Sequence, residues 1–262
     1  MKRILLLTTL LALLGTGSSD AAPFRTIKGS GVLRTETRDA KPYTAVKVAR
    51  GIAATLTAAP AGKLVVEADE RIIDFVQTTV DDDGTLRLTI DDDVRSISNC
   101  TVRISVPTPE ELRSLKASSG AAVTCQRVVK APALDVRASS GAGIEIAFEG
   151  EGCALAASSG AGIKANLSVD RCTVKAASGA EVSAKGRATE CRIGVSSGAS
   201  CNARNLLTVR TEAHASSGAS IRITCSGTLD AGASSGGSVS YWGDCRLVNH
   251  KKSLTGSVTH KR

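Results

Sequence analysis

The chain has 262 residues, with 33 Lys and Arg against 25 Asp and Glu, a net charge of +8 and 2% aromatic residues. This length fits one long domain or two ordinary ones. So few aromatic side chains leave little surface for stacking on bases, so nucleic acid is not an expected partner.

The first 21 residues have the pattern of a secretory signal peptide. Lys2 and Arg3 precede an apolar run at 4–14, and small residues lead to a cleavage site after Ala21. The run is too short to span a membrane, and no cysteine follows it before Cys100, which argues against a lipid anchor. We expect an exported protein of the periplasm or cell surface, with no membrane span after signal removal.

Residues 22–116 are expected to form an irregular, β-rich N-terminal portion. Alternating apolar and polar residues predict strands at 32–38, 43–48, 52–57, 63–68, 75–80, 86–90 and 101–106. Asp82-Asp83-Gly84 predicts a hairpin turn, and residues 69–74 predict one capped helical turn. Such a portion is typical of the irregular end that closes a solenoid.

Residues 117–262 carry a short turn sequence, mostly Ser-Ser-Gly, that returns at a nearly fixed interval. Its glycines are spaced 21, 19, 19, 19, 20, 18 and 20 residues apart, at Gly120, Gly141, Gly160, Gly179, Gly198, Gly218, Gly236 and Gly256. A fixed period near twenty residues is the signature of a solenoid, in which each coil buries its apolar edge against its neighbours.

The residues around each turn predict that the coils consist of strands. Apolar residues stand three and five places after the glycine, as in Ile144 and Ile146, and also seven, five and three places before it. This period of two excludes helices, which the Gly and Ser pairs would also interrupt. Neither a leucine-rich frame nor a six-residue period is present. We predict an all-β protein, a right-handed parallel β-helix with about 19–20 residues per coil and a narrow interior of small side chains.

The order of these features resembles the bacterial head GIN domains, a family also described as auto-transporter adhesins. The likeness rests on Gly29-Ser30-Gly31, the segments TAVKVARGIAATLT and KLVVEADERIIDFVQTTVDDDGTLRLTI, and the serial Ser-Gly-Ala turns. It covers about residues 29–236. The resemblance implies an exported β-helical domain, and it supplies no catalytic residues.

Three of the eight cysteines, Cys153, Cys172 and Cys191, lie seven residues before a repeat glycine, so they should stack in one inward column. Two interpretations stay open. The thiols replace aliphatic side chains of neighbouring coils, or disulfides such as Cys153–Cys172 or Cys172–Cys191 join adjacent coils. Because an in-line column offers no tetrahedron, we expect no metal and no other cofactor.

Most of the excess positive charge lies in residues 117–262, which hold 17 Lys and Arg against 10 Asp and Glu. Outward cations follow the turns at Lys164, Lys185, Arg204 and Arg222, and precede them at Arg137, Lys175 and Arg192. One interpretation is a face for an anionic ligand. The other is a solvated face whose charges discourage aggregation.

The sequence offers no catalytic constellation. Residues 232–236 match the Gly-x-Ser-x-Gly pattern of a nucleophile elbow, but they are one copy of the repeated turn. Asp81-Asp82-Asp83 and Asp91-Asp92-Asp93 are expected to be solvated loop tips rather than a calcium site, because adjacent aspartates project alternately.

We therefore expect a non-enzymatic β-helix with a structural or adhesive role in the bacterial envelope or at the cell surface. The alternative is a carbohydrate-binding or carbohydrate-active β-helix that acts on an acidic polysaccharide. The partners considered are an acidic polysaccharide or another envelope protein, and the sequence does not choose between them.

Overall fold

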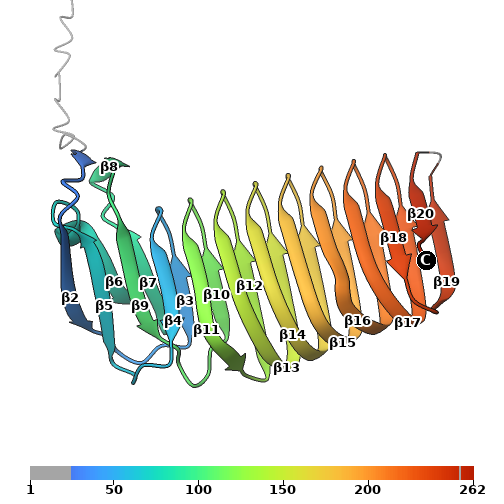
Figure 1. The fold of residues 1–262 in the computed structure, drawn as a ribbon, viewed down its shortest axis with the longest axis horizontal. Coiled ribbons are helices and arrows are strands. Elements are labelled where there is room, and N and C mark those ends of the chain that lie inside the picture. Colours follow the sequence, from blue (N-terminus) through green and yellow to red (C-terminus); the bar gives the residue numbers. More distant parts are fainter. Residues whose placement is uncertain (1–24, 254) are drawn as a thin grey trace, which may run out of the picture.

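The computed structural model describes residues 25–253 and 255–262, which form a straight rod of stacked strands (Figure 1). The predicted signal peptide at residues 1–21 lies outside the described residues. Within the described part of the chain, no helix has the length and apolarity needed to cross a membrane.

The body of the rod is a stack of long parallel strands. These are β11 (Ala122–Lys130) with β12 (Ala133–Ala138), β13 (Gly143–Ala157), β14 (Gly162–Ala176), β15 (Glu181–Val195), β16 (Ser200–Ala215) and β17 (Ser220–Ala233), and then β18 (Ser238–Trp242), β19 (Arg246–Lys252) and β20 (Ser257–His260). Each rung of the stack pairs in parallel with the next rung, as in Ile144↔Ile163 and Leu155↔Val174 between β13 and β14. The predicted all-β solenoid is confirmed.

A tight turn at each repeat glycine separates one rung from the next, and these turns form one edge of the rod (Figure 1). In the turn at 158–161, Ser159 has φ 53° and Gly160 has φ 70°. The amide of Ala161 donates to the carbonyl of Ser158 at 3.1 Å and closes the turn. Two successive residues with positive φ make a type I′ turn, which explains why glycine recurs at its second central position.

Each long strand bends near its middle, so its two halves lie in two facing layers (Figure 1). In β13 the buried residues are Ile144, Ile146 and Phe148 before the bend and Cys153, Leu155 and Ala157 after it. The inward phase therefore changes from even to odd numbers at the bend. Phe148 is 1% exposed and fills the interior there, although the sequence pattern predicts only small inward side chains.

The parallel stack takes in a rung from the N-terminal portion. β3 (Ala45–Val48) pairs with β10 (Ser114–Ala117), and β4 (Ala53–Thr57) pairs with β11. Between β3 and β4, Arg50 and Gly51 have φ 60° and 74°, and the Gly51 amide donates to the Ser119 carbonyl at 3.0 Å. This rung has the same turn as the repeats without their serines.

The next rung outward consists of β7 (Thr85–Ile90) and β9 (Val102–Pro107), which pair with β3 and β4. The order of rungs in space therefore differs from their order in the chain, because the rung at 45–57 lies between two later segments. The expectation of β-rich strands before residue 117 is confirmed, and their stacking order is a finding of the structure.

Antiparallel strands cover the N-terminal end of the stack. β2 (Leu33–Asp39) pairs with β5 (Lys63–Asp69), β5 pairs with β9, and β6 (Val76–Val80) forms the predicted hairpin with β7. β1 (Arg25–Lys28) and β8 (Val94–Ser98) make a separate two-stranded sheet. The predicted helical turn is a short 3₁₀ helix, η1 (Ile73–Phe75).

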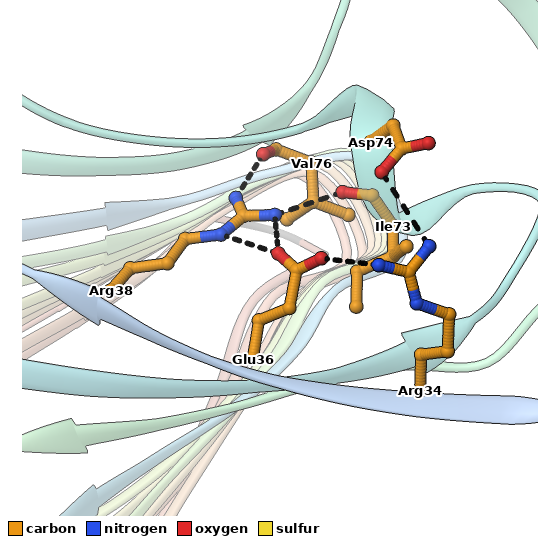
Figure 2. Close-up of polar contacts among 6 residues, drawn as sticks. All are labelled: Arg34, Glu36, Arg38, Ile73, Asp74 and Val76. Carbon is orange, nitrogen blue, oxygen red and sulfur yellow. Dashed lines mark hydrogen bonds and ion pairs between the residues drawn. The ribbon is translucent and has the colours of Figure 1, made fainter.

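Charged side chains of β2 hold η1 in place (Figure 2). The Arg38 guanidinium lies 2.8 Å from the Glu36 carboxylate and donates to the carbonyl oxygens of Ile73, at 2.9 Å, and Val76. Arg34 contacts the other oxygen of Glu36 at 3.1 Å and lies 3.9 Å from Asp74. The network therefore connects β2 to η1.

Candidate functional site

A row of cations crosses the outer face of the layer that enters the turns. The row occupies the position four residues before each turn glycine, and the strand register places its members on successive rungs. Its members are Lys47, Lys116, Arg137, Ala156, Lys175 and Gly194. Successive rungs are roughly 4.8 Å apart, so this basic row sets four cations along six rungs.

The basic row borders a hollow of about 780 Å³. The hollow reaches the edge of the rod, where it is lined by the first serine of four turns, at Ser118, Ser139, Ser158 and Ser196. A second hollow of about 580 Å³ lies on the same layer nearer the bends. It is lined by Gly152, Ala154 and Arg171 among others.

Both hollows lie where the second half of β13 turns only small side chains outward. These outward residues are Gly152, Ala154 and Ala156 of β13, followed by Ser158 in the turn after it. On one side they pair with β12, which carries Arg137, and on the other with β14, which carries Arg171 and Lys175. We call the two hollows on this rung the trough.

Cations outnumber carboxylates along the trough, because Lys47, Lys116, Arg113, Arg137, Arg171 and Lys175 line it against Glu111 and Asp135. Among the described residues, no carboxylate lies within ion-pair distance of Lys47, Lys116 or Lys175. Arg137 is held by Asp135 at 2.8 Å, and Arg171 is 3.9 Å from Glu151. Among the residues that the structure describes, the side-chain hydroxyls of the rim serines make no hydrogen bond to another protein group. The trough can therefore offer ammonium, guanidinium and hydroxyl donors to an anionic ligand.

The sequence-predicted cations Lys164, Lys185, Arg204 and Arg222 lie on the other layer, which leaves the turns. Lys164 and Arg222 share a row, with Ser183 and Asn202 between them and Glu145 beside Lys164. Lys185 is in the adjacent row, between Asn166 and Asn205. The Arg204 guanidinium stacks over Trp242, 4.6 Å from the ring centre. The structure does not join these four residues into one cluster.

The cysteine column is in register inside the solenoid. Cys153 pairs with Cys172, and Cys172 pairs with Cys191, as strand partners in successive rungs. All three are buried, and the eight cysteines of the structure are free thiols. Burial, with the neighbouring Cys172 and Asp135, raises the pKa of the Cys153 thiol well above its usual range.

Comparison with protein families connects this architecture to other chains. The profile of one family matches residues 42–245, and that family is described as "Putative auto-transporter adhesin, head GIN domain". The chain belongs to this family. The head GIN domain therefore covers both the rung at 45–57 and the repeats with Ser-Ser-Gly turns.

Solved structures share the fold of this head GIN domain. A "putative adhesin" from Parabacteroides merdae ATCC 43184 is 18% identical, with a TM-score of 0.83 over 90% of this chain and 99% of that one. A "putative lipid binding protein" from Parabacteroides distasonis ATCC 8503 is 17% identical, with a TM-score of 0.80 over 91% and 100%. A "putative adhesin" from the same organism is 16% identical, with a TM-score of 0.79 over 90% and 100%. No curated protein gives a significant match.

Sequence reasoning found only part of the basic row of this head GIN domain. Arg137 and Lys175 stand at the same outward position before a repeat turn, so their spacing in the sequence predicts that they lie on the same face. Lys116 has the same spacing before Gly120, the first repeat glycine, whereas Lys47 precedes Arg50-Gly51, a turn without serine that the repeat does not align with the others. The floor at Gly152 and Ala154, which is only partly exposed, follows from the register between β12, β13 and β14 and not from the sequence pattern.

Proposed function

We propose that this head GIN domain is a non-enzymatic adhesive module of the cell envelope or surface, and that its trough binds an acidic polysaccharide. The observation that carries the proposal is the alignment of Lys116, Arg137 and Lys175 beside a floor of glycine and alanine. Opposite charge attracts a polyanion to this face, and the absence of bulky side chains on the floor lets an extended chain approach the backbone.

A repeated ligand suits a repeated surface. The cations and the rim serines recur in steps of the rung spacing, so a polymer with regularly placed acidic groups can meet several of them at once. Each exposed ionic contact is weak, about 0.2–1 kcal/mol, and several of them add up along the chain. Binding of this kind should weaken steeply as salt rises.

The short turns support adhesion rather than catalysis. A catalytic cleft on a scaffold of this kind is built mainly from long loops, whereas the turns beside the trough have two central residues each, as at Ser159 and Gly160. The carboxylate nearest the basic row, Asp135, is tied to Arg137. The family description as an adhesin points in the same direction.

The experiment is to titrate the purified protein, without its signal peptide, with polygalacturonate, alginate and neutral dextran at low and high salt. We expect both acidic polymers to bind at low salt, lose affinity at high salt and stay intact, and dextran not to bind. Equal binding of dextran would contradict the charge-based proposal. Release of unsaturated sugars would show a lyase instead of an adhesive module, and failure of every polymer would favour a protein partner.

A further inference from the structure

From Arg137 onward the basic row has a spacing of two rungs. Its strand partners run from Arg137 through Ala156 to Lys175, and from there through Gly194 to His214. Every second rung therefore carries a basic side chain at this position, and the rungs between carry only a methyl group or a hydrogen atom. Because neighbouring strands lie about 4.8 Å apart, the basic residues repeat about every 9.6 Å. The stack is straight (Figure 1), so the spacing is kept along the rod.

The positions between the basic residues suit an uncharged group. Ala156, between Arg137 and Lys175, has no hydrogen-bond donor in its side chain. The space above Gly194 is open, because a Cβ placed there would meet nothing within 4 Å. A carboxylate held over either position would lose water without gaining a side-chain donor in its own rung, whereas an uncharged sugar ring would not have this cost. The two kinds of rung therefore suit two different sugars.

We propose that the trough selects acidic polysaccharides in which charged and neutral sugars alternate, over polymers with an acidic group on every sugar. An extended sugar residue is about as long as one rung spacing, so a disaccharide covers two rungs. Carboxylates on every second sugar then meet Arg137 and Lys175, and the neutral sugar between them lies over Ala156. This inference rests on the proposed function of the trough and adds the charge pattern of its ligand.

The groups around this central position can contact both sugars. The ion pair with Asp135 uses the Nε atom of Arg137, and in the described part of the chain its two terminal nitrogens have no protein acceptor. A guanidinium has five N–H donors, so these nitrogens can bind a second carboxylate. Ser158, which follows the rung of Ala156, lines the same hollow. Its hydroxyl can bond to the hydroxyls of the neutral sugar.

Toward the N-terminal end of the rod the row has cations on adjacent rungs. Lys47 is in phase with Arg137, and Lys116 lies between them. Arg87, the strand partner of Lys47 on its other side, forms an ion pair with Asp81 at 2.7 Å. Lys116 therefore distinguishes the two kinds of ligand. A polymer with an acid on every sugar meets Lys116 and Arg137 together, whereas an alternating polymer in phase with Arg137 places a neutral sugar at Lys116.

The first test fills the neutral positions. Ala156→Lys with Gly194→Lys adds cations to the empty rungs, and Asn166→Lys with Asn205→Lys adds the same charge at exposed positions of the other layer as a control. Each protein is titrated at low salt with polygalacturonate, which is charged on every sugar, and with hyaluronan, which alternates glucuronate with uncharged N-acetylglucosamine. Relative to the control, we expect the filled variant to gain roughly fivefold in affinity for polygalacturonate and less than about twofold for hyaluronan.

Removal of single cations gives a second readout, which does not depend on the filled variant. Lys175→Gln should weaken the binding of both polymers about twofold. Lys116→Gln should weaken polygalacturonate to the same extent and leave hyaluronan unchanged. An equal gain for both polymers in the filled variant, or an equal loss for hyaluronan in the two glutamine variants, would overturn the alternating pattern while the proposed function stands. If neither polymer binds the wild type, the proposed function fails and this inference fails with it.

Discussion

The amide of Gly160 donates a hydrogen bond to the carbonyl of Ser178, 3.0 Å away in the turn of the next rung. The same bond joins Gly141 to Ser159 and Gly179 to Ser197. The turns are therefore a continuous hydrogen-bonded column and not only reversals of the chain. This column holds the serine rim of the trough in a straight line.

The conformation of the turn predicts the effect of a methyl group at Gly160. A Cβ there would meet nothing within 4 Å, so Gly160→Ala has only the backbone cost of a left-handed alanine. We expect the free energy of unfolding to fall by about 1 kcal/mol in urea. Gly162 lies two residues further on, and its φ is not in the left-handed region. Gly162→Ala should therefore change the free energy of unfolding by less than about 0.5 kcal/mol. Equal effects of the two substitutions would contradict this description of the turn.

A stronger effect is expected at Gly186, which lies at the bend of β15. Its φ is +106°, and a Cβ there would be 2.1 Å from the carbonyl oxygen of Leu167 in the neighbouring rung. Gly186→Ala should lower the free energy of unfolding by about 2–3 kcal/mol, because backbone strain and overlap act together. Urea unfolding of Gly186→Ala and Gly160→Ala under the same conditions measures the difference. A smaller loss of stability for Gly186→Ala than for Gly160→Ala would show that the backbone at the bend can move to accommodate the methyl group.

The network in Figure 2 predicts a difference between two arginines of β2. Arg38→Met removes the bonds to the carbonyls of Ile73 and Val76 and to Glu36. We expect a loss of about 2 kcal/mol in stability and faster amide exchange around η1. Arg34 is half exposed, so Arg34→Met should cost less than about 0.5 kcal/mol. Similar losses for both arginines would contradict the assigned role of Arg38.

The buried thiols predict a loss of stability in alkali. Burial, with Cys172 nearby, raises the pKa of Cys201 to about 12, against 9.0 for an ordinary thiol. Between these values the unfolded chain has released a proton that the folded chain still holds. Above pH 9 the free energy of unfolding should therefore fall, and the Cys201 thiol contributes at most about 1.4 kcal/mol per pH unit to this fall. Below pH 9 the protonation of Cys201 should not affect stability.

Cys201→Ala isolates that contribution. The urea midpoints of the variant and the wild type are compared at pH 8 and again at a pH between 9.0 and about 12. The two midpoints should lie closer together at the higher pH. The convergence arises because only the wild type loses stability through this thiol. A constant difference across both pH values would show that the thiol keeps its ordinary pKa in the folded protein.

The periodic part of the fold could be predicted from sequence because one turn chemistry repeats. Gly160 and its equivalents mark positive φ, and alternation around Ile144 and Ile146 marks the inward face. The rung at 45–57 escaped this reasoning because Arg50-Gly51 makes the turn without serine. Its place between β7 and β10 depends on long-range pairing, which no local pattern contains. The trough was missed for the same reason, since its floor at Ala154 and its walls come from three different rungs.

The central claim is that the trough, and no other cationic face, holds an acidic polymer. Its most direct test compares two triple variants of equal charge: Lys116→Gln, Arg137→Gln and Lys175→Gln in the trough, and Lys164→Gln, Lys185→Gln and Arg222→Gln on the other layer. Titration with polygalacturonate at low salt should show roughly a tenfold loss of affinity for the first triple, because three exposed contacts of about 0.5 kcal/mol each are removed. The second triple should lose less than about threefold. Equal losses in the two variants, or full affinity in the first, would contradict the claim.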